Sequence, residues 1–422
     1  MSGLSEQAVP TVVSWNLTRR CNLACRHCYL DATQRKCPSP AELTTVESCR
    51  VIEQVAALAP GAMLVMSGGE PLLRGDLPRL VAHAAARRLT PVVGTNGTLL
   101  TERRARTLQD AGAGGVGVSV DSAAAAFHDR LRGARGAWRG ALRGALAAQR
   151  AGMAVSLQAT LFEQNCGELA ALADLAESVG AMALNFFFLV CTGRGAKQTD
   201  LTPRQYDETL VRILQLQRER PRLLIRARCA PYVRRVLALR GGDGAARFAA
   251  WSSACLAGRS YLRITPEGQV TPCPYIPEVL GALTQATLRE IWEHHPALQR
   301  LRSELPAGKC GSCDFRYGCG GCRARALAAH GDLMGEDPNC IHVRPAGALP
   351  EPAPQASPDP DMAWEPAAQA LLQRIPGFVR MHVKARLELR AAREGRNLIT
   401  ADFMRAHRPP SVSPGRDAAD TT

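Results

Sequence analysis

The fold of this chain is decided by the stretch Trp15-Asn16-Leu17-Thr18-Arg19-Arg20-Cys21-Asn22-Leu23-Ala24-Cys25-Arg26-His27-Cys28-Tyr29, which places three cysteines at the spacing C-x3-C-x2-C after the β-branched run Thr11-Val12-Val13. Three thiolates on one tight loop can hold three irons of a cubane cluster and leave the fourth iron open. A cofactor on that iron can accept an electron, and S-adenosylmethionine (SAM) is one carrier of radical chemistry. A zinc knuckle or a disulfide loop is the alternative, although zinc sites usually have four ligands and no fourth Cys or His has the usual spacing.

The cysteine motif, followed by the aromatic Tyr29, resembles the signature of the radical SAM superfamily. The resemblance implies a [4Fe-4S] cluster on Cys21, Cys25 and Cys28, whose fourth iron chelates the amino and carboxylate groups of SAM. Reductive cleavage of SAM would then give a 5′-deoxyadenosyl radical that abstracts a hydrogen atom from the substrate. The three cysteines are therefore the expected catalytic residues, and Tyr29 is an expected cofactor contact.

The composition is that of an ordinary globular protein: 422 residues, 46% of them hydrophobic and 21% charged, are enough for two or three domains. Residues 1–10 contain no apolar signal region, and no apolar stretch approaches the roughly 20 residues of a membrane-spanning helix. We therefore expect a cytoplasmic protein with no membrane partner. In that compartment, the fifteen cysteines are expected to bind metals or clusters rather than to form disulfides.

The net charge of +14 comes mostly from arginine. A basic surface can bind nucleic acid, but aromatic residues make up only 5% of the chain and no familiar nucleic-acid motif is present, so no nucleic-acid partner is expected. The excess of arginine can simply reflect a GC-rich genome. The functional interpretation is a polycarboxylate substrate, because guanidinium groups bind carboxylates through paired hydrogen bonds.

Short apolar runs alternate with longer amphipathic stretches between residues 11 and 225. The expected strands are Thr11–Leu17, Ala62–Ser67, Thr90–Gly94, Gly115–Val120, Met153–Leu161 and Ala183–Leu189. The expected helices are Leu43–Leu58, Asp76–Arg88, Glu102–Ala111, Trp138–Ala151, Cys166–Val179 and Thr202–Arg218. Six strand–helix repeats indicate parallel βα units in a barrel or an open sheet. The superfamily resemblance implies an α/β partial (β/α)6 TIM-like barrel with the cofactor at the C-terminal ends of its strands.

The segment Ser67-Gly68-Gly69-Glu70-Pro71 ends the second expected strand. Paired glycines allow a close approach of the backbone to a ligand, and Glu70 can accept hydrogen bonds from an ammonium group. A plain βα turn would explain the glycines but not the Glu-Pro that follows them. The segment resembles the superfamily motif that holds the SAM amino group, so Gly68, Gly69 and Glu70 are expected to bind the cofactor.

Polar residues also end the next three expected strands. The third strand ends in Gly-Thr-Asn-Gly, which resembles the superfamily motif near the SAM ribose and carboxylate and includes Thr95 and Asn96. Ser119 and Asp121 end the fourth strand as candidate contacts to SAM or substrate, and Gln158 on the fifth is a candidate contact to the ribose.

Seven cysteines cluster in the second half of the chain, with the spacing C-x2-C-x5-C-x2-C near its centre. A zinc ribbon separates its two C-x2-C pairs by about 15–20 residues, so five residues are too few for that pattern. Seven thiolates also exceed one metal site, and two centres are expected.

The order of these cysteines resembles the SPASM domain, an extension of radical SAM enzymes that binds auxiliary clusters. The resemblance implies one [4Fe-4S] cluster on Cys310, Cys313, Cys319 and Cys340, and a second on Cys255, Cys273 and Cys322. The fourth ligand of the second cluster is either Cys229 or absent, in which case an open iron could bind substrate.

Three strings resemble one subgroup of these enzymes: Ser253–Gly258, Thr271–Pro277 and Cys319–Ala326. That subgroup modifies siroheme-derived tetrapyrroles in the alternative haem and dioxo-haem pathways, by removing acetates, decarboxylating propionates or installing oxo groups. The resemblance implies a polyanionic tetrapyrrole substrate, which would account for the arginines, and reduced ferredoxin or flavodoxin as the electron donor.

A Pro-rich linker is expected at 345–363, followed by a small basic helical domain at 364–408 and a disordered tail at 409–422. Val379, Val383, Leu387 and Ala391 recur at i+4 and predict an amphipathic helix, and Thr400 can cap a short last helix. The segment 364–408 resembles a small domain that ends a subunit of light-independent protochlorophyllide reductase. The remaining expected domains are the partial barrel at 1–228 and the auxiliary-cluster domain at 229–344.

Two other functions compete with the tetrapyrrole enzyme. A peptide maturase would be expected to carry a peptide-recognition domain ahead of the barrel, and only residues 1–10 precede the first expected strand. A cluster-bearing electron-transfer or regulatory protein would account for the cysteines but not for Gly68, Gly69 and Glu70. SAM cleavage would exclude the second alternative.

Overall fold

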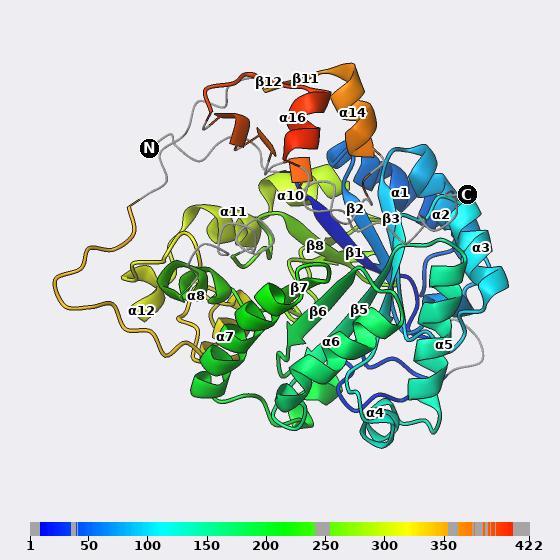
Figure 1. Cartoon of the computed structure of the whole chain (residues 1–422), viewed down its shortest axis with the longest axis horizontal. Helices are drawn as coiled ribbons and strands as arrows, with labels where there is room; N and C mark the ends of the chain where they lie inside the picture. The colour runs from blue at the N-terminus through cyan, green and yellow to red at the C-terminus, as the bar shows by residue number, and fades with distance from the viewer. Residues whose placement is uncertain are drawn as a thin grey trace, which may run out of the picture. The chain divides into compact units, whose positions relative to one another are not determined.

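The structure is a computed structural model, and it describes residues 9–34, 39, 41–240, 254–352, 362–373, 375, 383–384, 387–388, 390–392 and 394–407 (Figure 1). The chain divides into two compact units, residues 1–355 and 356–422, and each is described by itself.

The first unit is built on one sheet with the strand order β10-β9-β8-β1-β2-β3-β4-β5-β6-β7. Every neighbouring pair from β8 through β1 to β7 is parallel, whereas β9 and β10 are antiparallel to their neighbours. The strands are β1 Val12–Asn16, β2 Met63–Ser67, β3 Thr90–Thr95, β4 Gly115–Ser119, β5 Val155–Leu161, β6 Ala183–Phe188, β7 Leu224–Arg228, β8 Tyr261–Ile264, β9 Gln269–Thr271 and β10 Gly281–Ala282. The α/β partial barrel is therefore confirmed.

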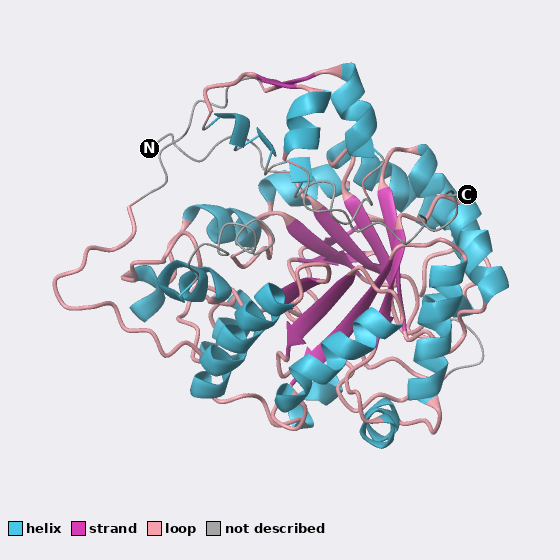
Figure 2. Ribbon diagram, in the orientation of Figure 1, coloured by secondary structure: helices cyan, strands magenta, loops and turns pink. Residues whose placement is uncertain are grey.

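Helices connect the parallel strands and surround them (Figure 2). They are α1 Thr45–Leu58, α2 Leu77–Ala86, α3 Glu102–Asp110, α4 Ala125–Arg132, α5 Ala137–Arg150, α6 Leu169–Ser178, α7 Pro203–Glu219, α8 Val233–Arg240, α10 Leu288–His294, α11 Pro296–Ser303, α12 Gly308–Gly311 and α13 Arg323–His330. The local sequence determines where several of these helices begin. Thr44 with Glu47 forms a capping box at the start of α1, and Thr202 with Gln205 forms one at the start of α7.

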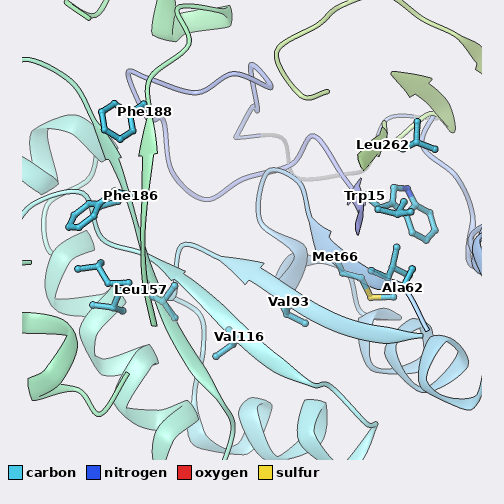
Figure 3. Packing of buried hydrophobic residues seen from close by; sticks show 14 of the residues in the cluster. Trp15, Ala62, Met66, Val93, Val116, Leu157, Phe186, Phe188 and Leu262 are labelled. Carbon is cyan, nitrogen blue, oxygen red and sulfur yellow. The ribbon is translucent and has the colours of Figure 1, made fainter. Parts of the chain in front are cut away.

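The main core lies between one face of this sheet and the helices. Alternate strand residues point to opposite faces, and the buried apolar set contributes at least one side chain from each of β1 to β6 and from β8 (Figure 3). The labelled examples are Trp15, Met66, Val93, Val116, Leu157, Phe186, Phe188 and Leu262. On β1, β5, β6, β7 and β8 the positions between these apolar residues are mostly polar, so the opposite face of the sheet is unusually hydrophilic.

All six predicted strands and six predicted helices are present, with ends within three residues of those expected. Sequence reasoning missed α4, β7 and β8. Strand β8 has four residues, which is too short for a periodic signal, and it comes from the cysteine-rich half yet pairs with β1. The sheet thus crosses residue 228, where we expected one domain to end; that boundary stays a prediction.

The second unit contains the two-stranded parallel sheet β11 Ala363–Trp364 and β12 Leu398–Ile399, with α14 Pro366–Gln373 and α16 Ala401–Ala406. Its core includes Ala368, Leu372, Leu387, Ala391 and Phe403. The Thr400 side chain accepts a hydrogen bond from the backbone of residue 403, which confirms the predicted cap of the last helix. Val379, residues 353–361 of the predicted linker and the tail 409–422 lie outside the described residues. No helix in the described parts of the chain is long and apolar enough to cross a membrane.

Candidate iron-sulfur and SAM site

The loop that carries Cys21, Cys25 and Cys28 leaves the C-terminal end of β1 and runs beside the end of β2. Leu17 N donates to Ser67 O at 2.8 Å, Gly69 N to Thr18 O at 2.7 Å, and Glu70 N to Arg20 O at 2.7 Å. The two strands therefore keep exchanging hydrogen bonds after the regular sheet ends. This pairing fixes the start of the cysteine loop at the edge of the sheet where ligands bind in parallel α/β folds.

The paired glycines are required by this close approach of two backbones. Gly68 has φ +141°, and a Cβ there would lie 2.6 Å from Thr18 O. A Cβ on Gly69 would overlap Arg20 O. Both glycines thus make room for the cysteine loop, and their predicted contact with SAM stays a prediction.

The three thiols of the loop are free and lie together in a small cluster of buried residues. Burial raises the pKa of Cys21 to about 11, although the Leu23 N–H lowers it by donating to Sγ at 3.4 Å, and the nearby Cys25 and Cys28 thiolates raise it further. Burial also raises the pKa of Cys25. These three thiols are soft ligands that lie together, and burial favours the protonated form of Cys21 and Cys25 as long as no cation is bound. They fit iron, because a bound metal replaces the thiol protons. The loop therefore fits three irons of a [4Fe-4S] cluster.

A buried ion pair packs against the Cys25 thiol. Arg132, the last residue of α4, lies with its Nη2 2.7 Å from Asp121 Oδ2 and donates from Nη1 to Cys25 Sγ at 3.8 Å. Asp121 Oδ1 accepts from Thr160 N at 3.0 Å, and His27 Nε2 lies 3.4 Å from Oδ2. Burial opposes the ionisation of both partners, yet Arg132 lowers the pKa of Asp121, and Asp121 with Cys25 raises that of Arg132.

Asp121 Oδ2 has its ion-pair contacts with Arg132 and His27, whereas two nitrogen atoms of this group, His27 Nδ1 and Arg132 Nε, have no hydrogen-bond partner among the described residues. Burial lowers the pKa of His27 to about 4 despite the opposing effect of Asp121, so the imidazole is neutral. Orphaned buried donors and acceptors call for an explanation. Polar groups of a bound cluster and its cofactor are the natural partners at this position.

Glu70, at the C-terminal end of β2, is fully buried and bridges to the end of β3. Its Oε1 accepts from Thr95 Oγ1 at 2.7 Å and from Leu72 N at 3.1 Å, and its Oε2 accepts from Asn96 N at 2.9 Å. Burial raises the pKa of Glu70, and these donors counteract the rise. The Asn96 amide donates to Asn22 Oδ1 at 2.9 Å, so the motif after β3 also holds the cysteine loop.

The remaining predicted contacts also lie near the C-terminal strand ends. Ser119 on β4 and Gln158 on β5 are paired in register, and the Gln158 amide packs over Gly117, where a Cβ would overlap it. The Tyr29 hydroxyl accepts from Asn16 Nδ2 at 2.9 Å, and its ring meets that of Tyr275 edge-on at 5.6 Å between centroids.

A second group of four cysteines converges in the cysteine-rich half. The buried Cys322 packs in one cluster with three other cysteines, Cys229, Cys255 and Cys273. Burial raises the pKa of Cys229 to about 11 and that of Cys322 to about 12, and the Cys255 thiolate contributes to both shifts. Cys229 has the left-handed φ of 57°, a conformation rare for a residue with a side chain. The structure thus places Cys229 with the three cysteines whose fourth ligand was left open.

A third group, Cys310, Cys313, Cys319 and Cys340, lines one pocket. Burial raises the pKa of each, and the Cys340 thiolate adds to the shifts of the other three. Cys313 also lies beside Asp314 and His342, whose carboxylate and ring are 2.6 Å apart. The structure thus brings together the cysteines of each predicted ligand set, and their binding of clusters stays a prediction.

Known proteins match this architecture. Residues 15–176 match the Radical SAM superfamily, residues 255–314 the iron-sulfur cluster-binding domain SPASM, and residues 364–408 the proto-chlorophyllide reductase 57 kD subunit family. An AdoMet-dependent heme synthase of Methanosarcina barkeri is 35% identical over 341 residues, which cover 79% of this chain and 97% of that protein. The chain belongs to the radical SAM superfamily.

Two further likenesses agree with that assignment. A pre-heme d1 synthase of Dinoroseobacter shibae is 33% identical, and the aligned region covers 78% of this chain and 85% of that protein. The crystal structure of Streptococcus suis SuiB bound to its precursor peptide SuiA has a TM-score of 0.64 and 16% identity over 79% of this chain and 76% of that one, which supports the fold.

This radical SAM protein is an enzyme that uses SAM and [4Fe-4S] clusters. Sequence reasoning missed several residues around its sites: Arg132, His27, Tyr275 and the arginines of β7 and β8. Arg132 lies eleven positions after Asp121, which follows the end of a predicted strand, but only the fold brings α4 back over the cysteine loop. The signal that could have found the strand arginines is a basic residue at alternate positions within an apolar run.

Proposed function

We propose that this radical SAM enzyme modifies carboxylate side chains of a siroheme-derived tetrapyrrole, by removing acetates, decarboxylating propionates or installing oxo groups. The observation that carries the proposal is the similarity to an AdoMet-dependent heme synthase along almost the whole length of that relative. The pre-heme d1 synthase relative, which is named for a related macrocycle, supports the same substrate class.

The chain's own residues would bind and orient the reactants at the C-terminal ends of the strands. Bound there, the cluster and SAM supply a carbon-centred radical that takes a hydrogen atom from the substrate. We assign Cys21, Cys25 and Cys28 as cluster ligands. Glu70, anchored by backbone N–H groups, would accept from the SAM ammonium with its remaining lone pairs.

Asp121 has a different proposed role from a direct SAM contact. Its two oxygens already meet Thr160 N, Arg132 and His27. We therefore propose that Asp121 holds Arg132 against the Cys25 thiolate and so positions the cluster. Ser119, Gln158, Tyr29, Thr95 and Asn96 stay candidates for the SAM and substrate contacts.

The electron donor and the compartment are also proposals. Cleavage of SAM needs one low-potential electron, for which reduced ferredoxin or flavodoxin is suited. Fourteen of the cysteines are described, and all are free thiols. Free thiols and clusters are typical of a reducing compartment, which supports the cytoplasm.

The test is an anaerobic incubation of the reconstituted, dithionite-reduced full chain with SAM and didecarboxysiroheme or iron coproporphyrin III. Formation of 5′-deoxyadenosine together with a change in porphyrin mass is the expected result. The matched control is Cys25→Ala, which removes one cluster ligand and should abolish both products. Cys166→Ser, at a cysteine outside the three thiol groups, should abolish neither.

Deoxyadenosine without any porphyrin change would reject the tetrapyrrole substrate and retain the enzyme class. Peptides would then be the next substrates to examine, since a related fold is known with a precursor peptide bound.

A further inference from the structure

Arginines occupy the hydrophilic face of the sheet on β7 and β8. Ile225 and Ala227 of β7 pack into or against the main core, so Arg226 and Arg228, at the alternate positions, point to the other face. On β8 the core residues are Leu262 and Ile264, and Arg263 lies between them. Three guanidinium groups therefore share the inner face of the partial barrel.

The strand register adds polar neighbours to these arginines. Arg226 is paired with Asn185 of β6, and Arg263 with Ser14 of β1. The Asn185 side-chain oxygen is buried and has no hydrogen-bond partner among the described residues. The face is therefore a polar surface inside the fold, in contrast to the apolar face that packs on the helices.

The burial of these arginines carries a cost in free energy, because burial disfavours a charged group. Arg226 and Arg263 are only 3% and 8% exposed, and Arg228 is half-buried. Burial lowers the pKa of Arg226, and the neighbouring charge of Arg228 lowers it further. Burial also lowers the pKa of Arg228, with Cys229 and Tyr261 opposing the shift. Buried cations are normally paired with anions.

Two other buried arginines of this chain are paired with carboxylates. Arg132 contacts Asp121, and Arg235 contacts Asp207. Among the described residues, by contrast, no carboxylate forms an ion pair with Arg228 or Arg263. Arg263 donates from Nε to Asn16 Oδ1 at 2.6 Å and lies 5.9 Å from the centre of the Tyr29 ring. A guanidinium has five N–H donors, so most of its capacity is unused by the protein.

These groups lie next to the reaction site. Arg263 contacts Asn16 and Tyr29, and Tyr29 directly follows the cluster ligand Cys28. Arg228 ends β7 and directly precedes Cys229 of the auxiliary group. A substrate anion between the cysteine loop and the auxiliary cysteines would therefore reach both guanidinium groups.

We propose that Arg228 and Arg263, with Arg226 and Asn185 beside them, bind the carboxylates of the substrate on the inner face of the barrel. The tetrapyrrole as the source of those carboxylates rests on the proposed function. The arginine site itself rests on the strand register, the burial and the absence of carboxylate partners for Arg228 and Arg263 among the described residues. Arginine forks bind carboxylates through two parallel hydrogen bonds, which would fix the orientation of a side chain that is to lose a hydrogen atom.

The experiment measures binding, not turnover. The full chain with reconstituted clusters is titrated anaerobically with iron coproporphyrin III, whose propionates are free, and with its tetramethyl ester, and absorption gives Kd. Arg228→Gln and Arg263→Gln should each weaken binding of the free acid about 10- to 100-fold, the range for hydrogen bonds to charged groups. The ester should bind weakly to the wild type and equally weakly to the variants.

Arg212→Gln is the matched control, because Arg212 lies on α7 in an exposed ion pair with Glu219 and should leave Kd unchanged. Arg228→Lys keeps the charge and should recover part of the affinity. Iron and sulfide content shows that each variant is folded, and a variant that loses its clusters is replaced by the Lys form at the same position.

Unchanged Kd in the folded Arg228 and Arg263 variants, or ester that binds the wild type as tightly as the acid, would overturn the arginine site and leave the proposed function standing. Failure of the wild type to bind any porphyrin would overturn the tetrapyrrole function. If a glutamate-rich peptide then bound in the same arginine-dependent way, the carboxylate site would stand with a different substrate.

Discussion

The Arg132–Asp121 pair is the most informative feature at the scale of single residues. A positive charge beside a cluster thiolate stabilises the more reduced, more negative cluster, and Asp121 offsets part of that charge. We therefore expect opposite effects from removing the two partners. Arg132→Gln should lower the midpoint potential of the catalytic cluster, and Asp121→Asn should raise it.

The expected size of each shift is about 60 mV, since about 1.4 kcal/mol corresponds to 59 mV for a one-electron couple. The measurement is an anaerobic redox titration followed by the EPR signal that changes when SAM is added. A merely structural role would change the iron content without moving the potential of the clusters that form. Shifts of the same sign in both variants would contradict the electrostatic role.

Gly69 offers a second test at this scale. A Cβ there would overlap the Arg20 carbonyl oxygen, so Gly69→Ala must push the cysteine loop away from β2. Overpacking of this kind costs about 1–3 kcal/mol of stability. We expect a lower melting temperature and incomplete iron loading. Gly75→Ala is the matched control, because nothing lies within 4 Å of its Cβ position. Equal behaviour of the two variants would show that the loop does not need the close approach.

At the scale of elements, β7 carries a cysteine immediately after its last residue. Cys229 is held in the left-handed region and packs with Cys255, Cys273 and Cys322. A strained backbone in such a place is consistent with ligand binding. Cys229→Ser is therefore expected to remove one cluster, about four irons per chain, from the reconstituted protein.

Cys166→Ser supplies the comparison, since Cys166 begins the turn before α6 and belongs to none of the three thiol groups. Iron and sulfide analysis measures the difference in cluster content between the two variants. Full iron content in Cys229→Ser would show that the cluster on Cys255, Cys273 and Cys322 has only three cysteine ligands. It would then have the open iron that the sequence analysis gave as the alternative.

How far the sequence predicts this fold also depends on its elements. The six βα units were predictable because apolar runs and amphipathic stretches alternate over more than 200 residues. Strand β8 was not predictable, because its four residues form a strand only by pairing with β1 in the folded chain. Spacing and resemblance also predicted which cysteines lie together, whereas their roles as cluster ligands stay predictions. The packing of Arg132 on Cys25, and of Gly69 on Arg20, depends on segments that meet only after folding.

At the scale of the whole molecule, the chain contains two units with separate cores. All three thiol groups belong to residues 1–355. A chain that ends at Gln355 is therefore expected to keep its full iron content and to cleave SAM at the rate of the intact protein. Loss of iron or of SAM cleavage in this shortened chain would show that the basic C-terminal unit supports the catalytic part.

In the proposed reaction, a hydrogen atom leaves a carboxylate side chain of a tetrapyrrole. The most direct measurement uses iron coproporphyrin III with deuterium in its propionate side chains, reduced holoenzyme and SAM, and determines the mass of the 5′-deoxyadenosine produced. The predicted result is deuterium in the deoxyadenosine together with a loss of mass from the porphyrin. Unlabelled deoxyadenosine beside an intact porphyrin would contradict the claim.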